Sequence, residues 1–193
     1  MLPKLYQVLQ QLLSATDKSS DVFTVSQKFR DDLINFFQPN KYNFLELGCY
    51  RGLTAKILAD HFVKYLGVDI SWKRLLIAKL SNVFNQNVRF KRFDLYKSDW
   101  DTLDFLADVV LIDAVHSYEF VRQDISNCIK RYKNAFIVFD DYGAWEGVYK
   151  AVNEAIDESR LEILQEVGAR KGELNSLFPN NLGSEGLICR VVC

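Results

Sequence analysis

The sequence predicts an α/β protein built on a doubly wound parallel sheet. Short strand-like runs alternate with segments of helical period along the whole chain. Two of these runs, VVLI and FIVF, are apolar without alternation, as is typical of strands buried on both faces of a parallel sheet. The chain has 193 residues, 49% of them hydrophobic, and no repeat or linker, so we expect one domain spanning residues 1–193.

Seven strand-like runs are predicted. They cover residues 43–47, 65–69, 88–93, 107–112, 135–139, 161–164 and 186–192. The connection 165–185 has a loop-like composition, so the last strand could enter the sheet antiparallel.

Helices are predicted between the strands and before them. The apolar stripes that indicate two of the helices are Leu53, Ile57, Leu58 and Phe62, and Val148, Val152, Ala155 and Ile156. Two further helical patterns, at 3–14 and 26–37, precede the first strand. We expect residues 1–38 to form a helical cap on a core of residues 40–193.

The charge and cysteine content narrow the class of protein. There are 24 basic and 25 acidic residues, so the overall charge does not favour a nucleic-acid partner. The four cysteines form no CxxC pair, which argues against a zinc site and a disulfide framework and for thiols in a reducing cytoplasm. No secretory leader and no apolar run of spanning length is seen, so we expect a cytoplasmic protein without a membrane partner.

The turn ELGCYRG (46–52) follows the first predicted strand, where α/β sheets usually bind ligands. Gly48 permits a sharp bend, and Gly52 would let the next helix begin close to the ligand. The turn lacks the GK[ST] of a phosphate loop, and Tyr50 replaces the middle glycine of GxGxxG. Glu46 suits a ligand with an ammonium group. The alternative is a helix-entry turn without a ligand.

Two further acidic residues follow the next strands. Asp69, in GVDI, can accept hydrogen bonds from both hydroxyls of a ribose; the alternative is a helix N-cap, although Ser71 can fill that role. Asp94, in RFDL, could bind an adenine amino group or cap the next helix.

A second acidic group is expected at the ends of the fourth and fifth strands. Asp113, Asp140 and Asp141 should converge there, and three carboxylates so close together favour a bound cation. All-oxygen ligands suit Mg²⁺. His116, three residues after Asp113, could take a proton from a hydroxyl near neutral pH. The alternative is that Asp113 caps a helix and that Asp140 and Asp141 lie in a solvated turn.

The three segments ELGCYRG, GVDIS and RFDL, in this order, resemble the cofactor half of the class I S-adenosylmethionine (SAM)-dependent methyltransferases, which are Rossmann-like. The resemblance covers about residues 40–193 and implies an antiparallel seventh strand. It implies that Glu46, Gly48 and Gly52 lie against the methionine part of SAM, that Asp69 binds the ribose and that Asp94 lies near the adenine. The other cofactor contacts it implies are Cys49, Tyr50, Ile70, Leu95 and Asp113.

The segments IDAVHSYE and DDY resemble the metal-dependent sugar O-methyltransferases of the macrocin and mycinamicin type and, more distantly, catechol O-methyltransferase. This resemblance implies Asp113, Asp140 and Asp141 as Mg²⁺ ligands and His116 as the catalytic base. The chain is much shorter than the macrolide enzymes, so their substrate and oligomeric state cannot be transferred to it, and a homo-oligomer is possible.

The sequence therefore predicts a SAM- and Mg²⁺-dependent O-methyltransferase that acts on a hydroxyl of a small molecule, a sugar or another vicinal diol. Tyr118, Tyr142, Trp145 and Phe178 are candidates for the acceptor wall. One alternative is an NAD(P)-dependent oxidoreductase, which would share the fold and Asp69 but leaves the second acidic group unexplained. Another is a binding protein that keeps the SAM fold without catalysis.

Overall fold

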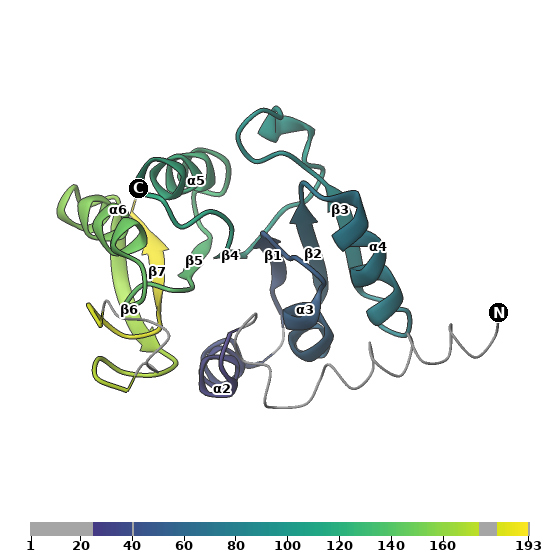
Figure 1. Ribbon diagram of the computed structural model, residues 1–193, viewed down its shortest axis with the longest axis horizontal. Coiled ribbons are helices and arrows are strands. Elements are labelled where there is room, and N and C mark those ends of the chain that lie inside the picture. The colour runs from purple at the N-terminus through teal and green to yellow at the C-terminus, as the bar shows by residue number, and fades with distance from the viewer. Residues whose placement is uncertain (1–24, 40, 174–180, 193) are drawn as a thin grey trace.

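The computed structural model describes residues 25–39, 41–173 and 181–192, and in them a single seven-stranded sheet forms the centre of the molecule (Figure 1). The strands are β1 (Asn43–Leu47), β2 (Lys64–Asp69), β3 (Val88–Arg92), β4 (Val109–Ile112), β5 (Phe136–Phe139), β6 (Leu161–Val167) and β7 (Gly186–Val191). Their order across the sheet is β3-β2-β1-β4-β5-β7-β6. The predicted α/β class and all seven strands are confirmed.

The last strand runs against its neighbours. Strands β1 to β5 pair in parallel, whereas β7 lies between β5 and β6 and is antiparallel to both. The predicted antiparallel seventh strand is therefore confirmed. Strand β6 is longer than predicted, because its pairing with β7 continues past an irregularity between Ile163 and Gln165 as far as Val167.

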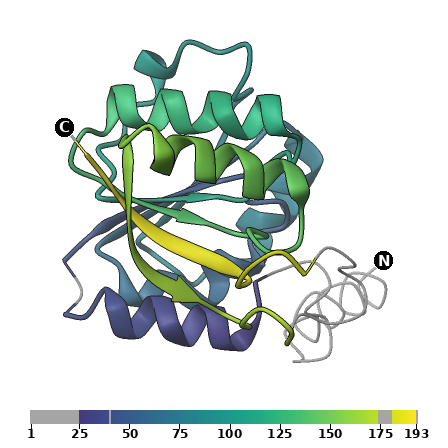
Figure 2. The ribbon, with the colours of Figure 1, turned by 90° about the vertical axis from the view of Figure 1, so that its left-hand side faces the viewer.

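Helices cover both faces of the sheet. They are α2 (Gln27–Phe36), α3 (Leu53–Leu58), α4 (Trp72–Ser81), α5 (Tyr118–Arg131) and α6 (Glu146–Asp157), with short 3₁₀ helices η2 (Ala59–His61) and η3 (Trp100–Thr102). Figure 2 shows α5 and α6 on one face and α2 on the other. Alternate residues of β1 serve the two layers: Leu45 and Leu47 pack in the core beneath α5 and α6, and Phe44 packs with α2 and α3.

The predicted stripes of α6 and α3 are both largely confirmed. In α6 the side chains of Val148, Val152 and Ala155 are buried. Helix α3 ends at Leu58 and continues into η2; Leu58 and Phe62 of its stripe are buried in the core, whereas Ile57 is 38% exposed.

Helix α2 confirms the second N-terminal pattern, and the predicted helix at 3–14 lies outside the described residues. The Ser26 hydroxyl caps α2 by accepting from the Phe29 N–H. The Ser26 N–H and hydroxyl also donate to the Glu185 carboxylate at 2.8 and 2.6 Å. These bonds fix the start of α2 beside the first residue of β7.

Three of the four cysteines, Cys49, Cys128 and Cys189, are buried as free thiols, and Cys193 lies outside the described residues. Of the helices in the described ranges, none combines the length and apolar character needed to cross a membrane.

Candidate active site

The glycine turn after β1 packs directly on the loop that follows β4. The N–H groups of Gly48 and Cys49 both donate to the Val68 carbonyl, at 2.9 and 3.0 Å. Gly48 has φ of 91°, and a Cβ on it would lie 2.0 Å from the Asp113 carbonyl oxygen. Only glycine fits this place. The predicted cofactor turn and the predicted acidic group are therefore in contact.

Gly52 is required for helix packing, a role that the sequence interpretation did not include, and its contact with a ligand stays a prediction. It has φ of 70° and caps the N-terminus of α3. A Cβ on Gly52 would lie 2.9 Å from atoms of Ala78, Asn82 and Phe90, which belong to α4, the residue after it, and β3. The side chain of Asn82 donates to the Gly52 carbonyl at 2.9 Å. Gly52 thus lets α3 approach α4.

Glu46 faces the interior, which removes support for its predicted contact with an ammonium group. It is 1% exposed, on the same face of β1 as Phe44, and its carboxyl group accepts a 2.8 Å hydrogen bond from the Tyr65 hydroxyl. Burial raises the pKa of Glu46 to about 8, although the bond from Tyr65 lowers it in part. Glu46 is therefore largely neutral at pH 7.

Asp69 lies at the end of β2 with both carboxylate oxygens already engaged. One oxygen accepts the Tyr50 N–H at 3.2 Å, and the other accepts the Ser71 N–H at 2.7 Å. Arg74 lies 3.7 Å away, and Ser71 is the N-cap of α4, as the sequence suggested. Since each carboxylate oxygen has two acceptor positions, this group can still accept ribose hydroxyls.

Of the remaining predicted cofactor residues, Ile70 and Asp94 are accessible to solvent, whereas Cys49 and Leu95 are buried. Ile70 is 54% exposed beside Asp69 and offers an apolar surface at the rim. Asp94 accepts the Tyr96 N–H at 3.1 Å in a local turn after β3. The side chains of Cys49 and Leu95 are buried, so a ligand would meet these two residues through their backbone.

Asp113, His116 and Asp141 come together at the ends of β4 and β5. The His116 Nε2 atom lies 3.2 Å from Asp141 Oδ2 and 3.6 Å from Asp113 Oδ1. Neither contact has hydrogen-bond geometry, and Nε2 is a buried atom without a hydrogen-bond partner. One potential ligand atom from each of the three residues lies within 4.8 Å of the others. Asp141 has φ of 59°, which turns it toward the group.

Asp140 stands apart from this group, in contrast to the predicted set of three aspartates. It is 7% exposed, and its carboxylate accepts the Asp141 N–H at 2.8 Å. The left-handed backbone at Asp141 separates the directions of the two neighbouring side chains. His116, not Asp140, is the third potential metal ligand of the group. The spacing DxxH between Asp113 and His116 is the sequence signal that could have indicated this.

The electrostatics of the group favour a bound cation. Burial raises the pKa of Asp141 to about 6, an effect that His116 opposes and Asp113 reinforces. Burial also raises the pKa of Asp113. For His116, burial alone would lower the pKa, but the adjoining carboxylates of Asp113 and Asp141 outweigh it and the pKa is raised. An imidazole nitrogen without a hydrogen-bond partner, flanked by two carboxylates, is suited to hold a divalent ion.

Of the predicted acceptor wall, only Trp145 faces this group. Its ring stacks on His116 with centroids 5.5 Å apart and 19° between planes, and it is 47% exposed. Tyr142 is buried against Tyr149. Phe178 lies outside the described residues.

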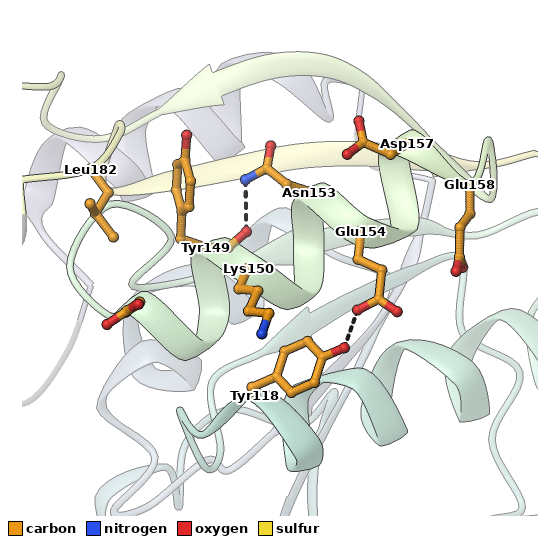
Figure 3. A pocket seen from close by; sticks show the side chains of 9 residues that line it. Tyr118, Tyr149, Lys150, Asn153, Glu154, Asp157, Glu158 and Leu182 are labelled. Carbon is orange, nitrogen blue, oxygen red and sulfur yellow. Dashed lines mark hydrogen bonds between the residues drawn. The ribbon is translucent and has the colours of Figure 1, made fainter.

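A pocket of about 700 Å³ runs along α6 next to this region (Figure 3). Its lining residues are Tyr118, Glu146, Tyr149, Lys150, Asn153, Glu154, Asp157, Glu158 and Leu182. The Tyr118 hydroxyl donates to Glu154, and Lys150 lies over the Tyr118 ring. The pocket does not include Asp113, His116 or Asp141, so we place the chemistry at the strand ends and not in this pocket.

Neither a search against protein-family models nor a search of curated proteins finds a match to this sequence. Solved structures do match. An O-methyltransferase from Bacillus cereus in complex with S-adenosylhomocysteine (SAH) has a TM-score of 0.65 at 18% identity, covering 97% of this chain and 91% of that chain. A SAM-dependent methyltransferase from Clostridium acetobutylicum has a TM-score of 0.66 at 11% identity, covering 98% of this chain and 100% of that chain. The N-methyltransferase NodS from Bradyrhizobium japonicum in complex with SAH has a TM-score of 0.62 at 17% identity, covering 96% of this chain and 97% of that chain.

These likenesses concern the fold. The chain has the Rossmann-like methyltransferase fold, with the seven-stranded mixed sheet predicted from its sequence. The matching structures include O- and N-methyltransferases and a ribosomal protein L11 methylase. The fold therefore leaves the methyl acceptor undecided, and the site residues have to indicate it.

Proposed function

We propose that this chain, which has the Rossmann-like methyltransferase fold, is a SAM-dependent O-methyltransferase that acts on a hydroxyl group of a small molecule with the help of a divalent cation. The observation that carries the proposal is the His116 Nε2 atom, buried without a hydrogen-bond partner between Asp113 and Asp141. This group adjoins the turn at Gly48. A methyl donor and a metal-assisted acceptor site would thus lie side by side.

The cofactor would lie along the ends of β1, β2 and β3. Gly48 allows close approach to the backbone, and Asp69, held by two N–H donors, would accept the ribose hydroxyls. The exposed side chain of Ile70 would contact the adenine, with Asp94 at the far side of the base.

When bound, SAM supplies an electrophilic methyl group, and a divalent cation lowers the pKa of an acceptor hydroxyl. Asp113 and Asp141 would hold the cation, which the sequence predicted to be Mg²⁺. The Trp145 ring, stacked on His116, fixes the imidazole plane and offers an exposed face for an acceptor. Most of the acceleration would come from positioning and charge stabilisation, and orientation alone is worth roughly 7 to 11 kcal/mol in intramolecular reactions.

A small acceptor fits these features better than a nucleic acid. The acceptor side of the site is acidic, with Asp113 and Asp141 beside each other, and would repel phosphates. A sugar or another vicinal diol could place two oxygens on one cation. The buried free thiols of Cys49, Cys128 and Cys189 fit a reducing cytoplasm.

The test is a calorimetric titration of the purified protein with SAH and, separately, with NAD⁺ and NADP⁺. We expect micromolar binding of SAH and none of the dinucleotides. A screen of vicinal diols with methyl-labelled SAM, with divalent ions and then with EDTA, would follow. Binding of a dinucleotide in place of SAH would establish the oxidoreductase alternative, and SAH binding without transfer to any hydroxyl compound would favour a non-catalytic protein.

A further inference from the structure

We propose that His116 is a metal ligand through Nε2, together with Asp113 and Asp141, and that the site therefore selects a first-row transition ion such as Zn²⁺ or Fe²⁺ over Mg²⁺. The inference deepens the proposed function, because it concerns the cation of the same site. The metal binding itself requires no methyl donor and can be measured alone.

The distances between the donor atoms support a shared ion. Ligand atoms about 2.1 Å from a tetrahedral ion lie roughly 3.4 Å apart. The His116 Nε2 atom lies 3.2 Å from an Asp141 oxygen and 3.6 Å from an Asp113 oxygen. These contacts lack hydrogen-bond geometry, so no hydrogen bond fixes Nε2 to either carboxylate. An ion that displaces the proton from this nitrogen would meet its lone pair between two carboxylate oxygens.

The kind of donors decides between metals. Mg²⁺ favours octahedral oxygen coordination and keeps several waters, whereas imidazole suits Zn²⁺ and Fe²⁺. The expected oxygen set would need Asp140 as its third member. Its carboxylate instead accepts the N–H of Asp141, and it is absent from the group of convergent donors found in the described residues. Two carboxylates and one imidazole therefore make up the set.

The ring of His116 is held for this role. Stacking against Trp145 restrains the plane of the imidazole. Ligating histidines are generally held in one orientation by neighbouring groups, most often through a hydrogen bond from the other ring nitrogen. A nitrogen whose lone pair binds a metal cannot also take a proton. His116 would then not be the base that its position after Asp113 suggested. The ion would lower the pKa of the acceptor hydroxyl, so that solvent water could take its proton.

The experiment measures metal binding in the absence of SAM. Zn²⁺ and Mg²⁺ are titrated by calorimetry, and the Mn²⁺-loaded protein is examined by pulsed electron paramagnetic resonance, which detects a coordinated imidazole nitrogen. We expect Zn²⁺ to bind at least about a hundredfold more tightly than Mg²⁺. We also expect nitrogen coupling to Mn²⁺ in the unmodified protein, and its loss in His116→Ala together with a weakening of at least about tenfold.

Two control variants make the result specific. The sequence contains two histidines, so His61→Gln tests whether binding comes from the other imidazole, and it should leave the coupling unchanged. Asp140→Asn keeps an acceptor for the Asp141 N–H and should bind the ion as the unmodified protein does.

Three results would overturn the inference: Mn²⁺ bound without nitrogen coupling, no preference for Zn²⁺, or loss of the ion in Asp140→Asn but not in His116→Ala. The last would restore the three-aspartate site. Failure of the proposed function would look different, because a protein that binds Zn²⁺ through His116 but no SAH retains the metal site and loses the methyltransferase assignment.

Discussion

Asp69 and the group of Asp113, His116 and Asp141 both lie at the carboxyl ends of parallel strands, and they differ in how far the protein itself satisfies them. Asp69 receives two backbone N–H groups and faces Arg74. The His116 Nε2 atom, in contrast, is buried between two carboxylates without a hydrogen-bond partner. We call the surroundings of Asp69 the nucleoside half and the group of Asp113, His116 and Asp141 the acceptor half, after their roles in the proposed function. The carboxylate of the nucleoside half already has partners within the protein, whereas Nε2 of the acceptor half has none.

This difference indicates how the two halves recognise their ligands. A carboxylate held by two N–H groups keeps one orientation, so it can read the hydroxyls of a ribose with little reorganisation. Groups that lack partners are costly when buried, and a cation is the simplest partner for two carboxylates and an imidazole. In the proposed function, the nucleoside half would therefore recognise its ligand through hydrogen bonds, and the acceptor half would bind a positive charge.

The largest expected effect comes from removing charge in the acceptor half. Asp141→Asn is suited to the purpose, because asparagine tolerates the left-handed φ of 59°. We expect methyl transfer to fall roughly a thousandfold, within the range for loss of an acid–base or metal group. SAH affinity should stay within about twofold, since Asp69 is untouched. Turnover and calorimetry on one preparation measure both quantities, and equal losses would mean that the two halves are not separate.

The contact between the halves should be broken by Gly48→Ala. The added Cβ would lie 2.0 Å from the Asp113 carbonyl oxygen, at a φ of 91°. We expect the free energy of unfolding to fall by roughly 3 kcal/mol or more. Gly172→Ala is the matched control: its φ is 93° but nothing lies within 4 Å, so only backbone strain of about 1 to 2 kcal/mol should appear. Urea unfolding of both variants checks this, and similar losses would contradict a steric role for Gly48.

Glu46 offers a third kind of strand carboxyl, buried and largely neutral. Its pKa is raised to about 8, so the folded state binds a proton that the unfolded state has lost above pH 4.5. The stability it provides is present at low pH and declines as pH rises from about 4.5 through about 8. Glu46→Gln should remove this decline and raise the melting temperature at pH 9 relative to the unmodified protein, with little change at pH 5. A pH series of thermal unfolding would refute the assignment if both proteins declined in parallel.

Asp69→Asn should weaken the nucleoside half without touching the acceptor half. Asparagine turns one acceptor into an NH₂ group that faces the N–H of Tyr50 or Ser71. Loss of hydrogen bonds to a charged acceptor costs about 1.5 to 3 kcal/mol, so SAH affinity should drop roughly 10- to 100-fold. Binding of Zn²⁺ should remain as in the unmodified protein. Calorimetry with each ligand separates the outcomes, and unchanged SAH binding would remove Asp69 from the cofactor site.

The sheet could be predicted from the sequence because β4 and β5 are uninterrupted apolar runs and the other strand-like runs alternate with helical segments. The predicted strand ends fell within a few residues of the observed ones. The end of β6 was missed, since QEV carries no apolar run and is held as a strand by pairing with β7. Strand pairing is a property of the partner as much as of the segment.

The candidate site was predicted in position more successfully than in detail. That Asp113, His116 and Asp141 share one edge follows from parallel strands. The direction in which each side chain points does not follow from the strand order, because it depends on the backbone conformation of single residues. Asp141 in the left-handed region sends Asp140 elsewhere, and alternation along β1 sends Glu46 under α3. The packing role of Gly52 was missed because the three residues that it contacts lie in α4, directly after α4 and in β3, far from Gly52 in the sequence.

The smallest effect is expected from Arg74, the remaining partner of Asp69. Its guanidinium lies 3.7 Å from the carboxylate and about half of the side chain is exposed, so water and salt screen the pair. It also lies over the Tyr50 ring, 4.6 Å from the centroid. If the two N–H groups are what hold Asp69, Arg74→Gln should change SAH affinity by less than about fivefold, corresponding to at most about 1 kcal/mol. Calorimetry at low and high salt measures this. A loss as large as that of Asp69→Asn would show that the nucleoside half, like the acceptor half, depends on a neighbouring positive charge, and the contrast between them would disappear.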